Sequence, residues 1–206
     1  NPDLARKIIR AAQEGIKIAG KKIPVSVKTR IGFNKEEIDT WIGELVKEDI
    51  AALTVHLRTR KEMSKVPANW EYIPRIKKII KESGKGILLI GNGDVKNIED
   101  AKEKAKKYGC DGVMIGRGVF GNPWLFDEKK KEIRIEEKLD ALVEHTKLFE
   151  KELSDFKNFD VMKKHFKAYV NDFKGAKELR IKLMETKNSK EVERIIKSFL
   201  KTKNRG

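Results

Sequence analysis

Short apolar runs alternate with amphipathic stretches along the first 126 residues, and this alternation restricts the possible folds more than any other feature. Four runs rich in β-branched and apolar residues are typical of strands: 23–28, 51–56, 87–90 and 112–115. Stretches with helical spacing of apolar residues precede or separate them: 4–12, 35–48, 70–81 and 98–107. Strands that alternate with helices form parallel sheets with right-handed crossovers. The pattern therefore predicts an α/β fold.

The strand-like runs stop after Asn122-Pro123, and only helical patterns follow. Four stretches with apolar faces predict helices: 133–153, 159–173, 175–185 and 189–200. This shift in pattern predicts two domains, an α/β domain over 1–126 and an all-helical domain over 127–206.

Charge and hydropathy indicate the kind of partner. Lys and Arg number 47 against 32 Asp and Glu, which gives a formal net charge of +15. Such an excess favours a polyanion, because phosphate contacts release counterions, although the same excess also serves solubility alone. No apolar run approaches the ~20 residues of a membrane span, and the N-terminal residues lack a secretory signal pattern. We therefore expect a cytoplasmic protein with no membrane partner.

Cysteine and histidine are sparse. Cys110 is the single cysteine, which excludes an internal disulfide framework and a cysteine-rich zinc site. His56, His145 and His165 lack the spacing of metal ligands, so no metal site is predicted. Cys110 precedes a predicted strand, and we interpret it as a small core residue.

Polar residues follow each predicted strand. Cationic or imidazole side chains come at the ends of the first two strands, and glycine-bracketed turns follow the last two: Lys28, His56, Arg58, Arg60, 91–94 and 116–118. The carboxyl ends of parallel strands share one rim, so these residues should meet there. Glycine turns let backbone N–H groups approach a phosphate, and Arg117 could add a bidentate contact. Each feature alone also has a purely structural interpretation, as a turn, a solvated lysine or a packed histidine.

In this order and spacing, the strand-end motifs resemble those of the tRNA-dihydrouridine synthase family. They are 25–30 (VSVKTR), 53–60 (LTVHLRTR), 90–94 (IGNGD), 113–118 (VMIGRG) and 121–126 (GNPWLF). The stretch 162–166 (MKKHF) with Leu179-Arg180 is similar to the helical domain of that family. The resemblance covers essentially the whole chain.

The resemblance implies an FMN-dependent (β/α)8 TIM barrel, followed by a helical tRNA-binding domain. The implied reaction is the NADPH-linked reduction of the C5–C6 bond of particular uridines in tRNA, with tRNA and not DNA as the partner. The implied FMN contacts are Lys28, His56, Asn92, Gly93, Asp94, Gly116 and Arg117. The implied RNA contacts are Arg58, Arg60, Lys163, Lys164, Lys167 and Arg180.

The chain departs from the family pattern in what it contains. Only four of the eight strands of a barrel are predicted, and nothing matches the Asn-x-Gly-Cys-Pro segment whose cysteine is the general acid. Cys110 cannot replace it, because it precedes its strand. Leu57 also stands where the family usually has glycine. We expect the C-terminal half of a barrel with its helical domain, and little or no activity from this polypeptide alone.

Two other functions fit parts of the pattern. The glycine turns also suit another FMN-dependent barrel acting on a small pyrimidine-like substrate, such as a dihydroorotate or dihydropyrimidine dehydrogenase relative. A non-catalytic RNA-binding remnant would explain the basic helices alone. Flavin absorbance would separate the flavoproteins from the remnant, and tRNA binding would separate the tRNA enzyme from the small-molecule enzyme.

Overall fold

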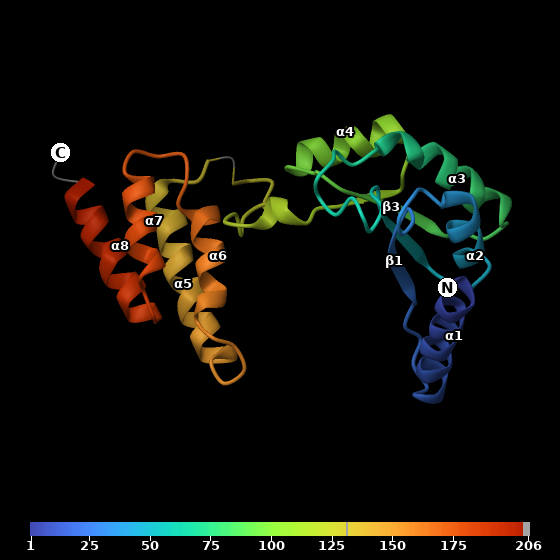
Figure 1. The fold of residues 1–206 in the computed structure, drawn as a ribbon, viewed down its shortest axis with the longest axis horizontal. Helices are drawn as coiled ribbons and strands as arrows, with labels where there is room; N and C mark the ends of the chain where they lie inside the picture. Colours follow the sequence, from blue (N-terminus) through green and yellow to red (C-terminus); the bar gives the residue numbers. More distant parts are fainter. Residues whose placement is uncertain (131, 204–206) are drawn as a thin grey trace. The chain divides into compact units, whose positions relative to one another are not determined.

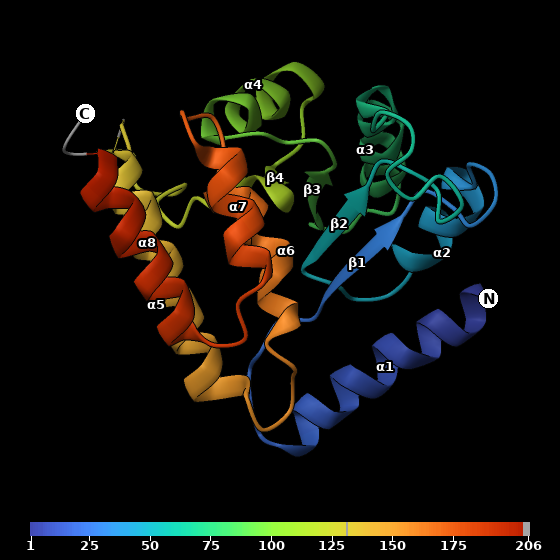
Figure 2. The ribbon, with the colours of Figure 1, turned by 60° about the vertical axis from the view of Figure 1, so that its left-hand side comes forward.

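Four parallel strands lie side by side in the order β1-β2-β3-β4 (Figure 2). The computed structural model describes residues 1–130 and 132–203, and these form two compact units, Asn1–Arg117 and Gly118–Gly206 (Figure 1). We call them the sheet unit and the helical unit. The strands belong to the sheet unit: β1 (Ser26–Arg30), β2 (Ala52–His56), β3 (Leu88–Asn92) and β4 (Gly112–Met114).

Helical segments precede, connect and follow the strands. They are α1 (Pro2–Ile18), the π-helix η1 (Ile38–Ile42), α2 (Gly43–Leu45), the 3-10 helix η2 (Trp70–Tyr72), α3 (Ile73–Glu82), α4 (Ile98–Tyr108) and the 3-10 turn η3 (Arg117–Val119). Local chemistry sets some of their ends. The Asn97 side chain accepts a 2.8 Å hydrogen bond from the Asp100 N–H at the start of α4, and Gly109 ends that helix with φ 78°.

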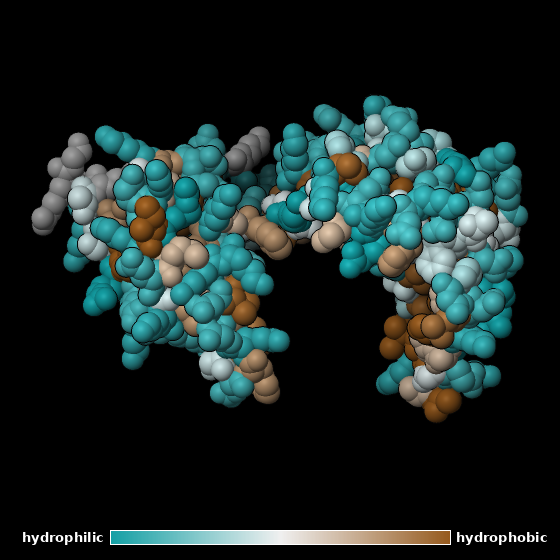
Figure 3. Space-filling model, in the orientation of Figure 1, coloured by the Kyte–Doolittle hydropathy of each residue, from teal (hydrophilic) through white to brown (hydrophobic). Residues whose placement is uncertain are grey.

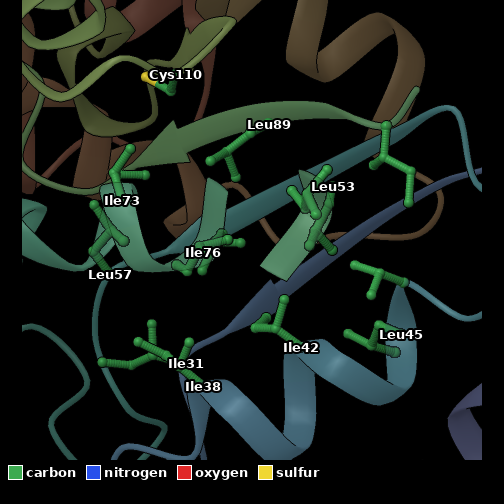
Figure 4. Packing of buried hydrophobic residues seen from close by; sticks show 14 of the residues in the cluster. Ile31, Ile38, Ile42, Leu45, Leu53, Leu57, Ile73, Ile76, Leu89 and Cys110 are labelled. Atoms are coloured by element: carbon green, nitrogen blue, oxygen red, sulfur yellow. The ribbon is translucent and has the colours of Figure 1, made fainter. Parts of the chain in front are cut away.

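One face of the sheet is covered by helices. Leu53 and Leu89 are almost fully buried there, and they pack with Ile42, Ile73 and Ile76 from the helical segments (Figure 4). Alternate residues of the same strands lie on the other face. We call this the uncovered face, because Lys28 is exposed and Leu88 keeps 53% of its surface, although Thr54 and Asn92 on the same face are buried.

Helix α1 is attached to the sheet unit through a buried carboxylate. Glu48, 5% exposed, accepts hydrogen bonds from Arg6 Nε (2.6 Å) and Arg10 Nε (2.8 Å). The opposite side of α1 is apolar surface, with Leu4 and Ile8 more than half exposed (Figure 3).

Within the described residues, the helical unit contains four α-helices that enclose a core of their own. They are α5 (Ile135–Leu153), α6 (Asp160–Tyr169), α7 (Ala176–Met184) and α8 (Ser189–Lys203). Helix α5 packs against α6 and α8, and α7 packs against the same two helices. Phe166, Leu142 and Leu183 are fully buried between them. Within the described residues, no helix combines the length and apolar character needed to cross a bilayer.

The predicted α/β class with parallel strands is confirmed, and each predicted strand and helix has an observed counterpart with shifted ends. The first strand lies later than predicted, at Ser26–Arg30, because its register pairs Ser26 with Ala52 and Arg30 with His56. The helix predicted over 35–48 is instead the short pair η1 and α2. The division into units falls after Arg117, and the predicted boundary after residue 126 stays a prediction, as does the role of the helices as a separate tRNA-binding domain.

Candidate functional site

The strand register brings the predicted site residues of the sheet unit together. Arg30, His56 and Asn92 occupy neighbouring positions across β1, β2 and β3 at the carboxyl ends of the strands. Lys28 donates a 3.3 Å hydrogen bond to Asn92 Oδ1, and Asn92 Nδ2 donates to the Met114 carbonyl of β4 at 2.8 Å. The Asn92 side chain thus links the two edge strands, β1 and β4. The exposed Lys28 ammonium still has N–H groups that are free to donate to a ligand.

His56 is the half-buried imidazole of this rim. Burial lowers its pKa to about 4, and the nearby charges of Arg30, Lys28 and Arg58 act in the same direction, while Asp94 opposes them. The ring is therefore neutral at physiological pH, and it has both a hydrogen-bond donor and an acceptor.

Arg58 lies inside the sheet unit, with 3% of its surface exposed. Its Nε donates to the Val66 carbonyl (2.6 Å), one terminal nitrogen lies 3.2 Å from His56 Nε2, and the other donates to the Asp94 carboxylate. All three nitrogens of the guanidinium are engaged within the protein. Arg58 has no free surface for an RNA phosphate, in contrast to Arg60, which is exposed.

Asp94 connects three segments at the turn after β3. Besides Arg58, it accepts hydrogen bonds from the Ala68 N–H (2.9 Å) and from Arg117 (3.1 Å). These donors, the Arg58 hydrogen bond foremost, hold the pKa of the Asp94 carboxyl below its usual range. Arg117 is two-thirds exposed, so its contact with Asp94 orients it while most of the guanidinium stays accessible.

Gly91, within β3, and Gly93, in the turn directly after it, allow close internal packing. A Cβ at Gly91 would lie 2.5 Å from the Trp70 ring, and one at Gly93, where φ is 130°, would lie 2.6 Å from Ala68 Cβ. The Trp70 indole also donates to the Gly93 carbonyl at 3.0 Å. Gly116 differs, because no atom would lie within 4 Å of a Cβ there. Of the two predicted phosphate turns, the one at Gly116-Arg117 therefore has the space that a ligand needs.

The predicted RNA contacts of the helical unit differ in how free their charges are. Lys163 pairs with Asp160 at 2.6 Å, and Arg180 donates to the Val170 carbonyl at 2.6 Å. Lys164 and Lys167 lie exposed on α6. The exposed pair is the better candidate for a polyanion contact.

Two structural contacts of the site could not be predicted from the sequence. Trp70 supports the β3 turn from below, and no local pattern marks a tryptophan at the start of a helix for that role. The bond between Arg58 and Asp94 joins residues 36 positions apart. Arg58 and Asp94 each belong to a strand-end motif, but the motifs alone do not show that these two residues bind each other.

The donor set suits an anionic ligand that carries a polar ring. Lys28 and His56 offer nitrogen donors at the uncovered face of the sheet. The buried Asn92 keeps one amide hydrogen beyond its bond to Met114, and Arg117 beside Gly116 offers a cation with open space next to it. This arrangement matches a phosphate at one end and ring carbonyls at the other.

Comparison with known proteins identifies the family of the chain. The sequence model described as "Dihydrouridine synthase (Dus)" matches residues 1–204. A probable tRNA-dihydrouridine synthase of Staphylococcus aureus (strain MRSA252) is 43% identical over 200 residues, which cover 96% of this chain and 59% of that protein. The probable tRNA-dihydrouridine synthase 2 of Bacillus subtilis (strain 168) is 41% identical over 96% of this chain and 60% of its own.

This chain thus spans about three-fifths of the length of the curated relatives that it matches. The motifs on which the sequence resemblance rested lie within the matched region, and the structure gathers several of them at one rim. Because the family model covers both units almost completely, the chain belongs to the dihydrouridine synthase family.

Proposed function

We propose that this chain supplies the cofactor-binding rim and the RNA-binding helices of a tRNA-dihydrouridine synthase. The reaction would convert uridine in tRNA, NADPH and a proton to 5,6-dihydrouridine and NADP⁺. The observation that best supports it is the row of donors formed by Lys28, His56 and Asn92, which ends near the open space at Gly116. Since tRNA would be the substrate, a cytoplasmic location follows from the proposal.

FMN fits this donor set, and when bound it would supply hydride transfer to the uracil ring. Arg117 and the backbone at Gly116 would hold the phosphate, because Gly116 is open and most of Arg117 is accessible. Lys28, His56 and Asn92 would donate to the polar edge of the flavin. Gly93 and Asp94 would act mainly by shaping the turn, since both are engaged in internal contacts.

The uncovered face of the sheet supports completion of a barrel by further strands. Strands β1 and β4 are the two edges of the sheet, and Leu88 and Met114 are apolar residues exposed on the uncovered face. Exposed sheet edges and apolar faces are normally covered by a partner. We propose that polypeptide outside these 206 residues covers them and contributes the general acid.

Cys110 does not have the properties of that acid. Its thiol is buried, burial raises its pKa, and it comes before β4 rather than after a strand. On the proposal, the isolated chain therefore has little or no synthase activity.

A chimera tests the proposal. The part of the Staphylococcus aureus relative that this chain does not match would be joined to this chain, and dihydrouridine would be measured in unmodified tRNA with FMN and NADPH. We expect turnover by the chimera, none by the 206-residue chain alone, and loss of flavin absorbance in the Lys28→Ala chimera. Robust turnover by the chain alone would contradict the half-barrel proposal. A flavin-loaded chimera that reduces free pyrimidines and not tRNA would favour the small-molecule alternative.

A further inference from the structure

We propose that Arg58 is a positioning residue that fixes His56 in the tautomer with its proton on Nδ1. His56 then presents an N–H donor at the uncovered face of the sheet, suited to a pyrimidinedione carbonyl such as those of a flavin or a uracil. This inference deepens the proposed function and rests on it for the identity of the acceptor. The tautomer itself does not depend on it.

The contact between the two side chains determines the tautomer. A terminal nitrogen of Arg58 lies 3.2 Å from His56 Nε2. A guanidinium has only donors, so Nε2 must accept through its lone pair. In a neutral imidazole, the one proton then lies on Nδ1.

Arg58 cannot easily turn away from this contact. Its Nε donates to the Val66 carbonyl at 2.6 Å, and its second terminal nitrogen donates to Asp94. Asp94 is itself held by the Ala68 N–H at 2.9 Å. With 3% of its surface exposed, Arg58 has no water-filled space for another rotamer. A group locked by packing and by hydrogen bonds of this kind is what precise orientation of a neighbour requires.

The imidazole edge opposite the arginine is the edge left for a ligand. A Cβ at Gly93 would lie 3.2 Å from His56 Cδ2 and 3.5 Å from Nε2, so the edge formed by these two atoms packs against the β3 turn. Nδ1 lies on the other edge of the ring, and it has no hydrogen-bond partner within the described residues. Lys28 and Asn92 occupy the same face of the sheet.

The charge state of His56 agrees with a fixed neutral tautomer. Burial and the cations Arg30, Lys28 and Arg58 lower its pKa to about 4, against the opposing charge of Asp94. A protonated ring would direct a second N–H at the Arg58 guanidinium, which is unfavourable.

Nitrogen NMR of the 206-residue chain reads the tautomer directly. Long-range ¹H–¹⁵N correlation at pH 7 distinguishes protonated from unprotonated ring nitrogens, and His145→Gln and His165→Gln assign the three histidines. We expect a protonated Nδ1 and an unprotonated Nε2 in His56. Arg58→Met should shift the population towards the Nε2–H form, and Arg58→Lys should restore it in part. A wild-type His56 with its proton on Nε2 would overturn the proposal, whether or not the variants fold.

Arg117→Met is the matched control, because Arg117 also binds Asp94 but has no hydrogen bond with His56. It should leave the tautomer unchanged, and an equal change in both variants would assign the effect to Asp94 and overturn the role of Arg58.

Additions of FMN and of uridine 5′-monophosphate, in separate samples, identify the acceptor. A shift of the His56 Nδ1 signal with either ligand supports the donor role and names its source, and a shift with neither contradicts it. The tautomer of His56 is measured without any ligand. That result would therefore stand even if the chain proved not to belong to a tRNA-dihydrouridine synthase.

Discussion

In the helical unit, residues from all four helices meet in a closed core, where Leu142, Phe166, Leu183 and Ile196 are at most 1% exposed. In the sheet unit, helices cover one face of the sheet, while Leu88 on the other face remains half exposed. Buried apolar area is the main source of stability, so the two units differ in how far their own residues can stabilise them. The helical unit buries its apolar side chains among its own helices, whereas the sheet unit leaves apolar side chains exposed on one face of its sheet.

Deleting a core side chain of the helical unit should have the largest effect. Phe166→Ala removes a fully buried ring, and we expect a loss of about 3–5 kcal/mol in the free energy of unfolding of that unit. Hydrogen exchange with mass spectrometry should show faster exchange in peptides from α5 to α8 and unchanged exchange in β2 and β3. Leu53→Ala is the matched change in the sheet unit, with the opposite pattern expected. Equal acceleration in both units after Phe166→Ala would mean that they unfold together.

Removing the charge of Glu48 tests how the sheet unit retains α1. Hydrogen bonds to charged groups contribute about 1.5–3 kcal/mol, so Glu48→Gln should speed exchange in peptides from α1 by roughly tenfold to a hundredfold. Glu44→Gln, which removes a more exposed partner of Arg6, should have a smaller effect. An unchanged α1 in Glu48→Gln would show that apolar contacts alone hold the helix.

Acid should act in the same direction. The hydrogen bond from Arg10, with that from Arg6, holds the pKa of Glu48 below its ordinary 4.5. The contribution of this carboxylate is therefore complete above 4.5 and is lost as the pH falls through the lower pKa of the folded state. As the pH is lowered, circular dichroism of the wild type should show a first loss of helical signal, from α1, at a higher pH than the unfolding of the sheet. This first step should be absent in Glu48→Gln.

The exposed lysines of α6 should affect tRNA binding with little change in stability. Neutralising Lys164 and Lys167 together should weaken tRNA binding by about tenfold at low salt. The slope of the logarithm of the binding constant against the logarithm of the salt concentration should become shallower by roughly 1.5–2. Stability should change by less than about 0.5 kcal/mol. The double change Lys147→Gln with Lys197→Gln removes the same charge from lysines that pair with Glu193, and it should matter less. Equal weakening by both pairs would assign binding to net charge alone.

Much of the fold could be predicted from the sequence because apolar periodicity reports which face is buried. Apolar periodicity mispredicted the local structure where contacts between residues far apart in the sequence determine it. The stretch 35–48 has helical spacing, but Arg75 binds Glu36 and Asp39 near its start, and Glu48 at its end binds Arg6 and Arg10. Only η1 and α2 are helical within this stretch.

In the candidate site, too, the sequence pattern predicted some features and not others. The sequence pattern placed Lys28, His56 and Asn92 at strand ends. The register brings His56 and Asn92 together beside Arg30, whereas Lys28 lies in the middle of β1, beside Thr54, and reaches Asn92 through its side chain. The burial of Arg58 could not be predicted, because an arginine after a strand is exposed in most proteins. The glycines at the end of β3 predicted a phosphate turn. In the structure, Gly91 within β3 and Gly93 directly after it leave room for Trp70 and Ala68.

The indole under the β3 turn has a practical consequence. Trp70 Nε1 donates to the carbonyl of Gly93, and its ring touches the position where Gly91 lacks a side chain. Indole emission changes with the hydrogen bond and the packing of the ring. Because the chain also contains Trp41 and Trp124, replacing both with phenylalanine would leave Trp70 as an optical reporter beneath the rim, sensitive to a ligand that moves this turn.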